Sequence, residues 1–280
     1  MESIRYAIVT PARNEADRIE QTIRAMASQS TLPVKWVIVS DGSTDGTDDI
    51  IKQHLQRFAW MDYVRMPEHR DRQFAAKVSA FNAGLARIEP DAYEIIGNLD
   101  ADITFDYEYF EYLIDKFSHN PNLGVAGTPF VEDGKAVYDY RFTNIEHVSG
   151  ACQLFRKDCF AEIGGYQPVK GGGIDWIAVT TARMKGWQTQ TFTGKVCYHH
   201  RQIGTGGHSS LKALYRHGQK DYYLGGHILW QVFRSLYQMT KRPYAIGGLM
   251  LLAGYISGMA LRMKRPIEED LIQFHRHEQM

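Results

Sequence analysis

Two aspartates separated by one residue, Asp100 and Asp102, follow directly on the apolar run Glu94–Leu99. The run has the composition of a buried strand, so both carboxylates are expected where that strand leaves a sheet. Ligands of open α/β sheets bind at the carboxyl ends of strands. Carboxylates there, together with substrate phosphates, are typical ligands of Mg²⁺ or Mn²⁺. The alternative is an acidic turn that caps the following helix.

Polar segments also follow the first two apolar runs of the chain. Thr10–Glu15 follows the first and Ser40–Thr47 follows the second, so both are predicted to line the same crevice. Asp41 can accept hydrogen bonds from a base or a ribose, and the glycines of its segment permit close approach of a backbone. Ser43 or Thr44 can cap the next helix, and a cap and turn without any ligand is the alternative.

These segments require a regular alternation of strands and helices to bring them together. Strands are predicted over 6–10, 34–40, 62–66 and 94–99, and helices over 17–28, 45–58 and about 74–88. This alternation predicts an α/β fold with a mostly parallel central sheet and helices on both faces. Further strands are expected over 135–142 and 151–155, within one domain that covers residues 1–207. Lys77 lies near the start of the third helix, where it can reach a diphosphate or simply belong to a solvated face.

The composition is that of a soluble globular protein, with 44% hydrophobic and 23% charged residues. A formal net charge of zero gives no indication of nucleic-acid binding. The three cysteines show no metal-ligand spacing and suggest reduced thiols. The N-terminus leads into a strand without the pattern of a signal peptide, so a cytoplasmic location is expected.

Residues 208–280 are predicted to form a separate helical region. A basic, aromatic helix is expected over 209–224, and residues 244–261 form an uncharged apolar stretch with basic residues on both sides. At 18 residues the stretch is marginal for a membrane span, which needs about 20. We expect it to contact a membrane as an interfacial or re-entrant helix, with the preceding basic helix facing anionic lipid. A single span and a buried core helix are the alternatives.

Taken in order, these segments resemble the family 2 glycosyltransferases with the GT-A fold. The resemblance covers roughly residues 5–200 and is carried by Pro11–Glu15, Asp41–Thr47, Lys77–Gly84, Asp100–Asp102 and Gly164–Trp187. It implies an inverting, hexosyltransferase-type transfer from a nucleotide-diphosphate sugar, with UDP the commonest nucleotide. The residues that it implies for the nucleotide sugar are Pro11, Arg13, Asn14, Glu15, Asp41, Ser43, Lys77, Asp100 and Arg201.

The resemblance also implies a general base. In this family it is an aspartate, usually after a glutamate, eleven residues before a helix-ending glycine, and counting back from Gly186 gives Asp175. Here Ile174 takes the place of the glutamate, which removes a neighbouring acid. An inverting transfer needs a carboxylate that takes the proton of the acceptor hydroxyl. Trp176 can stack on an acceptor sugar or belong to the core.

The metal implied by the resemblance is Mg²⁺ or Mn²⁺, bound by Asp102 through the diphosphate. A histidine near the end of the domain often completes the metal sphere, and we expect His200 in this role, with His199 second. Adjacent histidines on an extended segment point to opposite faces, so only one is expected to meet the site. Arg201 can compensate diphosphate charge as the leaving group departs.

The late part of the chain is also similar to bacterial exopolysaccharide-assembly transferases. This implies a glycan or lipid-linked acceptor in cell-surface polysaccharide synthesis at the inner face of the cell membrane. One alternative is a sugar nucleotidyltransferase, although Thr10–Glu15 lacks the glycine-rich phosphate loop that such enzymes usually have. Another is a non-catalytic membrane scaffold of a polysaccharide assembly complex.

Overall fold

The computed structural model describes residues 4–68, 74–132, 135–136, 144–200 and 210–280. The chain forms two compact units, Met1–Arg201 and Gln202–Met280. The predicted site segments Thr10–Glu15 and Ser40–Thr47 belong to the first unit. Arg201, which the sequence assigns to the diphosphate, lies outside the described residues.

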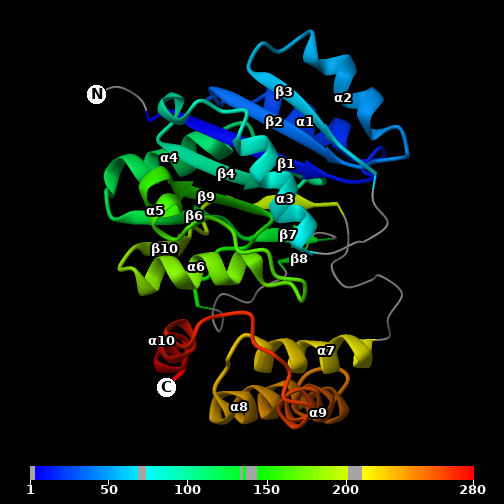
Figure 1. Ribbon diagram of the computed structural model, residues 1–280, viewed down its shortest axis with the longest axis vertical. Helices are drawn as coiled ribbons and strands as arrows, with labels where there is room; N and C mark the ends of the chain where they lie inside the picture. The colour runs from blue at the N-terminus through cyan, green and yellow to red at the C-terminus, as the bar shows by residue number, and fades with distance from the viewer. Residues whose placement is uncertain (1–3, 69–73, 133–134, 137–143, 201–209) are drawn as a thin grey trace. The chain divides into compact units, whose positions relative to one another are not determined.

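The first unit is built on a seven-stranded sheet in the order β10-β6-β9-β4-β1-β2-β3. All neighbouring strands pair in parallel except β9, which runs antiparallel to both β4 and β6. The predicted α/β fold with a mostly parallel sheet is therefore confirmed (Figure 1). The strands are β1 Tyr6–Ala12, β2 Lys35–Asp41, β3 Met61–Met66, β4 Ile95–Leu99, β6 Leu123–Gly127, β9 Cys152–Arg156 and β10 Gln188–Thr191.

Helices cover both faces of this sheet, which explains the continuous apolar runs of its central strands. On one face, α1 (Ile19–Ala27) and α4 (Tyr109–His119) join a buried cluster that includes Ile8 of β1. On the other face, α3 (Phe74–Leu85) places Gly84 so close to Val9 that no Cβ would fit there. The remaining helices of this unit are α2 Thr47–Leu55, α5 Lys157–Glu162 and α6 Ile174–Met184, with a short 3₁₀ turn at Pro90–Ala92.

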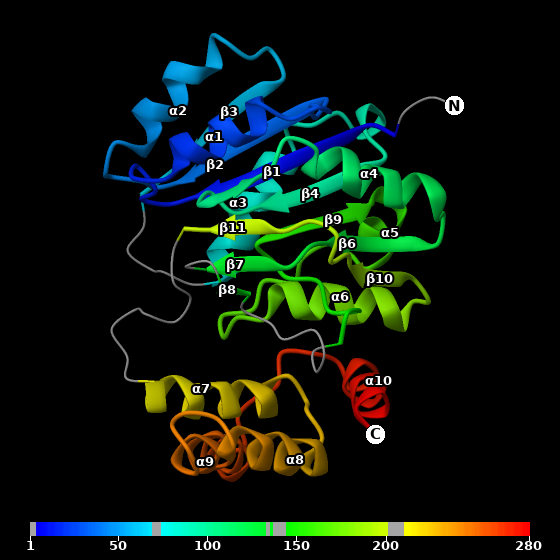
Figure 2. The same ribbon diagram turned by 180° about the vertical axis from the view of Figure 1, so that it is seen from behind.

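A second, four-stranded sheet lies beside the carboxyl end of β4, in the order β5-β11-β7-β8 (Figure 2). Its strands are β5 Ile103–Phe105, β7 Phe130–Glu132, β8 Lys135–Ala136 and β11 Cys197–His199. The antiparallel register of β11 on β5 pairs His199 with Ile103, next to Asp102. Of the strand predicted over 135–142, only β8 is described as a strand, since residues 137–142 lie outside the described residues.

Over its described residues, 210–280, the second unit has four helices, α7 Ser210–Tyr223, α8 Ile228–Met239, α9 Ile246–Ala260 and α10 Glu269–Gln279. Glycines set the packing of α9, because a Cβ at Gly254 would collide with the backbone of α7 and one at Gly248 with that of α8. At 15 residues α9 is about 22 Å long, short of the roughly 30 Å of a bilayer core. Among the described residues, no helix combines the length and the apolar character that a membrane span requires.

Candidate active site

The end of β4 is the centre of the candidate site. The Asp100 backbone N–H donates to the Ala151 carbonyl at 2.9 Å, and the Asn98 side-chain amide donates to the Gly150 carbonyl at 2.8 Å. Both contacts follow from the antiparallel pairing of β4 with β9, which places Asn98 opposite Gln153. The chain that carries both aspartates is therefore held by a strand that enters the sheet more than fifty residues later.

Asp100 is paired with a lysine from the opposite side of the site. Lys77, in the first turn of α3, makes a short ion pair and hydrogen bond with the Asp100 carboxylate. Burial raises the pKa of Asp100 above its usual value, the Lys77 ammonium opposes that rise, and the nearby Asp102 carboxylate adds to it. The structure thus brings together the lysine and the two acids that the sequence assigned to a diphosphate and its metal.

The segments after β1 and β2 interlock through hydrogen bonds. Asn14, which adopts a left-handed φ of 55°, donates from its backbone N–H to the Ser43 hydroxyl at 3.1 Å, and its amide oxygen accepts from the Thr44 N–H at 2.8 Å. The Glu15 N–H donates to the Thr47 hydroxyl at 2.8 Å. Ser43 therefore contacts the first segment, and the start of α2 is held instead by the carboxylate of Asp45, which accepts from the Thr47 N–H at 3.1 Å.

Acidic and basic side chains gather in the same two segments. Asp41 at the end of β2 is buried, and an Arg13 guanidinium nitrogen lies 4.0 Å from its carboxylate. Glu15 is also buried, whereas Pro11 is partly exposed on β1 and pairs in register with Val39. The six residues that the sequence assigned to the nucleotide from this region thus lie on two interlocked neighbouring segments.

The two adjacent histidines face different partners. His199 on β11 is nearly buried, with its Nε2 3.5 Å from the Asp102 carboxylate and its Nδ1 2.9 Å from the Glu132 carboxylate. His200 is exposed, and its Nε2 lies 2.8 Å from the Thr104 hydroxyl while its backbone N–H donates to the Asp102 carbonyl. The imidazole that approaches the Asp102 carboxylate is thus that of His199, the second-ranked candidate.

Glu132 belongs to the candidate site by its position, and sequence reasoning missed it. It lies on β7, and the parallel pairing of β7 with β11 brings it beside His199. A carboxylate on one imidazole nitrogen fixes the ring orientation and leaves the other nitrogen to act as a ligand. No local pattern around residue 132 announces this, because the contact depends on a pairing between segments 67 residues apart.

The side chains around Asp102 offer a partial rather than a complete metal shell. In the described ranges, no three His, Cys, Asp or Glu side chains converge in a way that could hold a metal ion. The Asp102 carboxylate and the His199 Nε2 nevertheless form a pair of oxygen and nitrogen donors, which suits Mn²⁺ or Mg²⁺ when a diphosphate and waters supply the remaining ligands. These residues fit a metal that arrives with its nucleotide.

Asp175 approaches the same place from α6. It lies in the first turn of that helix, which begins after Gly173 in a left-handed conformation with a φ of 90°. A Cβ built on Gly150 would lie 2.9 Å from the Asp175 Cβ and 3.2 Å from its Oδ2. Because the Gly150 carbonyl also accepts from Asn98, a single backbone residue separates the predicted base from the end of β4.

Tyr166 provides a second link between Asp175 and the end of β4 that carries Asp100. Its hydroxyl donates to the Gln153 side chain at 2.7 Å. Burial raises the pKa of Tyr166, and the carboxylates of Asp175 and Asp100 both raise it further. Trp176, next to the predicted base, is half-buried on α6. The structure therefore brings Asp100, Asp102 and Asp175 into one region.

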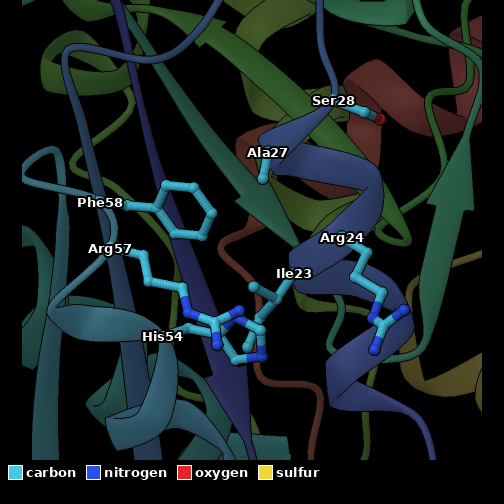
Figure 3. Close-up of a pocket in the computed structure, with 7 residues that line it drawn as sticks. All are labelled: Ile23, Arg24, Ala27, Ser28, His54, Arg57 and Phe58. Atoms are coloured by element: carbon cyan, nitrogen blue, oxygen red, sulfur yellow. The ribbon is translucent and has the colours of Figure 1, made fainter.

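A separate hollow of about 450 Å³ lies between α1 and the last turn of α2 with the segment that follows it (Figure 3). The side chains of Ile23, Arg57 and Phe58 lie toward one another there, whereas Arg24 projects from the other side of α1. None of the residues that line it is among the predicted site residues, so it is distinct from the region around Asp102.

Residues 7–164, more than half of the chain, match the model of the family described as Glycosyl transferase family 2. The chain belongs to glycosyltransferase family 2. It is 26% identical over 171 residues to the poly-beta-1,6-N-acetyl-D-glucosamine synthase of Staphylococcus aureus strain MSSA476, a match that covers 54% of this chain and 39% of that protein. The protein of the same name from Staphylococcus epidermidis is 24% identical over 214 residues, covering 68% of this chain and 47% of the relative. The chain thus spans less than half the length of these relatives.

Solved structures show the same fold at low sequence identity. The mannosyltransferase PcManGT from Pyrobaculum calidifontis, in complex with GDP-Man and Mn²⁺, matches with a TM-score of 0.59 and 18% identity, covering 95% of this chain and 77% of that one. Staphylococcus aureus TarS 1-349 in complex with UDP matches with a TM-score of 0.61 and 14% identity, covering 99% and 82%. The family resemblance inferred from the sequence is therefore confirmed, together with its fold.

Proposed function

We propose that this protein is an inverting, metal-dependent glycosyltransferase that moves a hexose from a nucleotide-diphosphate sugar to a glycan or lipid-linked acceptor in cell-surface polysaccharide synthesis. The observation that carries the proposal is the approach of Asp175 to the end of β4, where Lys77, Asp100 and Asp102 gather. Membership of family 2 supports the reaction class. The synthase names of the curated relatives support the polysaccharide context.

The donor would lie across the ends of β1, β2 and β4. The interlocked segments that carry Asn14 and Asp41 would hold the nucleoside, with buried carboxylates as acceptors for its polar groups. Lys77 would bind the diphosphate, since an ammonium near a helix N-terminus favours an anion. Arg201 would add a second cation. Solved structures of this fold contain UDP, UDP-GlcNAc or GDP-Man, and we propose UDP as the first nucleotide to test.

The metal ligands of the protein would be Asp102 and one of the two adjacent histidines. The 3.5 Å approach of His199 to the Asp102 carboxylate favours His199 over His200. A bound Mg²⁺ or Mn²⁺ would supply charge neutralisation for the departing diphosphate. The ion pair of Lys77 with Asp100 would set the charge balance of the protein beside the diphosphate.

Asp175 would act as the general base. In an inverting transfer the acceptor hydroxyl attacks the anomeric carbon on the side opposite the leaving nucleotide diphosphate. The bond from the anomeric carbon to the diphosphate oxygen breaks as the new glycosidic bond forms, and the hydroxyl proton passes to the Asp175 carboxylate. Trp176, adjacent to the base and half-buried, would offer a ring face to the acceptor sugar.

Calorimetry tests the donor site directly. UDP, GDP and dTDP are titrated with and without Mn²⁺ into the wild type and into Asp102→Asn. Metal-dependent binding of one nucleotide that is lost in the variant supports the proposal and identifies the nucleobase of the donor. Absence of binding to every nucleotide would instead support a non-catalytic scaffold. Release of nucleotide diphosphate from a sugar donor, abolished in Asp175→Asn without loss of binding, then tests the role of the base.

We also infer that transfer takes place at the cytoplasmic face of a cell membrane, with residues 208–280 in contact with the membrane surface. The support lies in the composition of this region, in which basic residues bound the apolar stretch 244–261 on both sides. A lipid-linked acceptor would be concentrated at the same surface. Flotation of the protein with bilayer vesicles tests this contact.

A further inference from the structure

Helix α8 has its polar and apolar faces reversed relative to a helix of a water-soluble domain. The polar residues Gln231 and Ser235 lie on its inner face, where only 2% and 1% of their surface is exposed. Leu229, Phe233 and Leu236, spaced at i, i+4 and i+7 on the opposite face, are 57–59% exposed. A soluble helix directs its apolar stripe inward, so α8 presents an apolar surface that the other helices of its own unit do not cover.

Helix α9 shows the same reversal in its side-chain sizes. The face that packs against α7 and α8 carries glycines. Gly248 and Gly254 leave no room for a Cβ, and a Cβ on Gly258 would press against the ring of Tyr222 at 3.0 Å. The opposite face exposes larger apolar side chains, among them Leu249 and Ile256 at 55% and 45%. Small residues inside and large apolar residues outside are typical of helices that pack together in lipid.

These two helices lie side by side and together form what we call the α8–α9 apolar face (Figure 1). It comprises Leu229, Trp230, Phe233, Leu236, Leu249 and Ile256. Exposed apolar surface on this scale marks an interaction site rather than ordinary protein surface.

The charges around the α8–α9 apolar face identify its occupant. Lys241 and Arg242 precede α9, Arg262 and Lys264 follow it, and all four side chains are exposed. Cations at both ends of an apolar helix suit the headgroups of anionic lipids, and an exposed tryptophan such as Trp230 prefers the interface between lipid and water. Since α9 is too short to cross a bilayer, the face fits a helix pair that lies in the plane of the membrane.

We propose that α8 and α9 form a monotopic insertion face that binds one leaflet of an anionic bilayer. The inference deepens the membrane contact proposed above and assigns it mainly to α8, which the sequence did not single out. It does not depend on the catalytic assignments of the first unit.

Vesicle flotation of the full chain tests this proposal. The probe is a vesicle of phosphatidylcholine alone or of phosphatidylcholine and phosphatidylglycerol at three to one. The wild type should bind the anionic vesicles, more weakly at high salt. The triple variant Leu229→Gln, Phe233→Gln, Leu236→Gln should bind at least about tenfold more weakly, because three large apolar side chains are lost. The matched control Leu32→Gln, Val34→Gln, at residues of the first unit exposed at 43% and 40%, should bind as the wild type does.

Fluorescence gives a second measurement that does not depend on the triple variant. Anionic vesicles should shift the emission of Trp230 to shorter wavelength, and Trp230→Phe should lose that shift. Failure of the wild type to bind vesicles, equal binding by the triple variant, or a dimer that the triple variant converts to a monomer without any vesicle binding would each overturn the proposal. Mn²⁺-dependent UDP binding, measured on the same preparations, reports separately on the donor site. Vesicle binding can therefore fail while nucleotide binding persists, and the reverse.

Discussion

The substitution Gly150→Ala tests whether Asp175 is positioned by the end of β4. The new Cβ would lie 2.9 Å from the Asp175 Cβ, and the two atoms must move apart by about 0.5 Å to reach the 3.4 Å of an ordinary contact. The crowded atom is the Asp175 Cβ. Because this atom stays in place when the side chain rotates, rotation of the carboxylate cannot relieve the collision. A misplacement of 1 Å costs about a hundredfold in rate, so we expect kcat to fall about tenfold or more.

The matched control is Gly124→Ala on β6. Its Cβ would lie 2.7 Å from the sulfur of Cys159 and from the Trp187 Cβ, so the crowding is comparable but involves none of the predicted site residues. Overpacking of this kind costs about 1–3 kcal/mol of stability. Both variants should therefore unfold at a lower temperature, whereas only Gly150→Ala should lose turnover.

The assay measures release of nucleotide diphosphate from the sugar donor, with water as acceptor, beside calorimetric binding of UDP and Mn²⁺. We expect Gly150→Ala to keep its nucleotide affinity, because the Asn98 amide still reaches the Gly150 carbonyl. Two results would refute the reasoning. One is an equal fall in kcat for both variants, and the other is a loss of nucleotide affinity as large as the loss of kcat.

Three further predictions concern charge and burial. Glu132→Gln should weaken Mn²⁺ binding in the presence of UDP at least about tenfold, because the ring of His199 loses the carboxylate that orients it. Titration followed by electron paramagnetic resonance measures this affinity, and the control variant Thr104→Ala should bind Mn²⁺ as the wild type does. Arg234→Gln should lower the free energy of unfolding by about 1–3 kcal/mol at pH 7.5 and by less at pH 4.5. Burial raises the pKa of Asp221, so a larger share of its carboxyl is protonated at the lower pH, and a protonated carboxyl no longer needs the Arg234 cation. Thermal unfolding of both proteins at the two pH values tests this difference. Burial raises the pKa of all three thiols, so Ellman's reagent should label native protein far more slowly than protein in guanidinium at Cys152, Cys159 and Cys197.

Much of the parallel sheet could be predicted because its central strands are buried on both faces. Such strands appear in the sequence as continuous apolar runs, and the runs at 6–10, 34–40, 62–66 and 94–99 correspond to β1, β2, β3 and β4 within two residues at either end. The first two helices between them, α1 and α2, show the spacing of amphipathic helices. The intervening helices were likewise predicted, with ends that differ by at most three residues.

The small sheet was harder to predict because its strands are short and their partners are distant in sequence. β5 and β7 are three residues long, too short for a periodic pattern to stand out. β11 pairs with β5 across more than ninety residues. The contact between His199 and Glu132 is therefore a product of the fold, and the ranking of His200 before His199 rested on position in the sequence alone.

The candidate site likewise contains residues that local sequence patterns reveal and a residue that only the fold reveals. Asp100, Asp102 and Asp175 carry motifs that a sequence reading can find. Gly150 carries none, because a glycine before a strand is common and its meaning depends on what packs against it. Its role follows from the insertion of β9 next to β4, which no pattern in the sequence predicts.

The antiparallel strand β9 gives this arrangement a mechanical consequence. In a wholly parallel sheet the neighbour of β4 would begin at the opposite edge, and its preceding residue would lie far from the aspartates. Because β9 runs the other way, the two residues before it reach the end of β4. There the Gly150 carbonyl accepts from the Asn98 amide, and a Cβ on Gly150 would lie 2.9 Å from the Asp175 Cβ. The spacing between the aspartates after β4, which we propose for the donor side, and Asp175, the proposed general base, is thus set by one backbone residue. Substitutions on α6 other than at Asp175 and Trp176 should affect turnover only insofar as they move that contact.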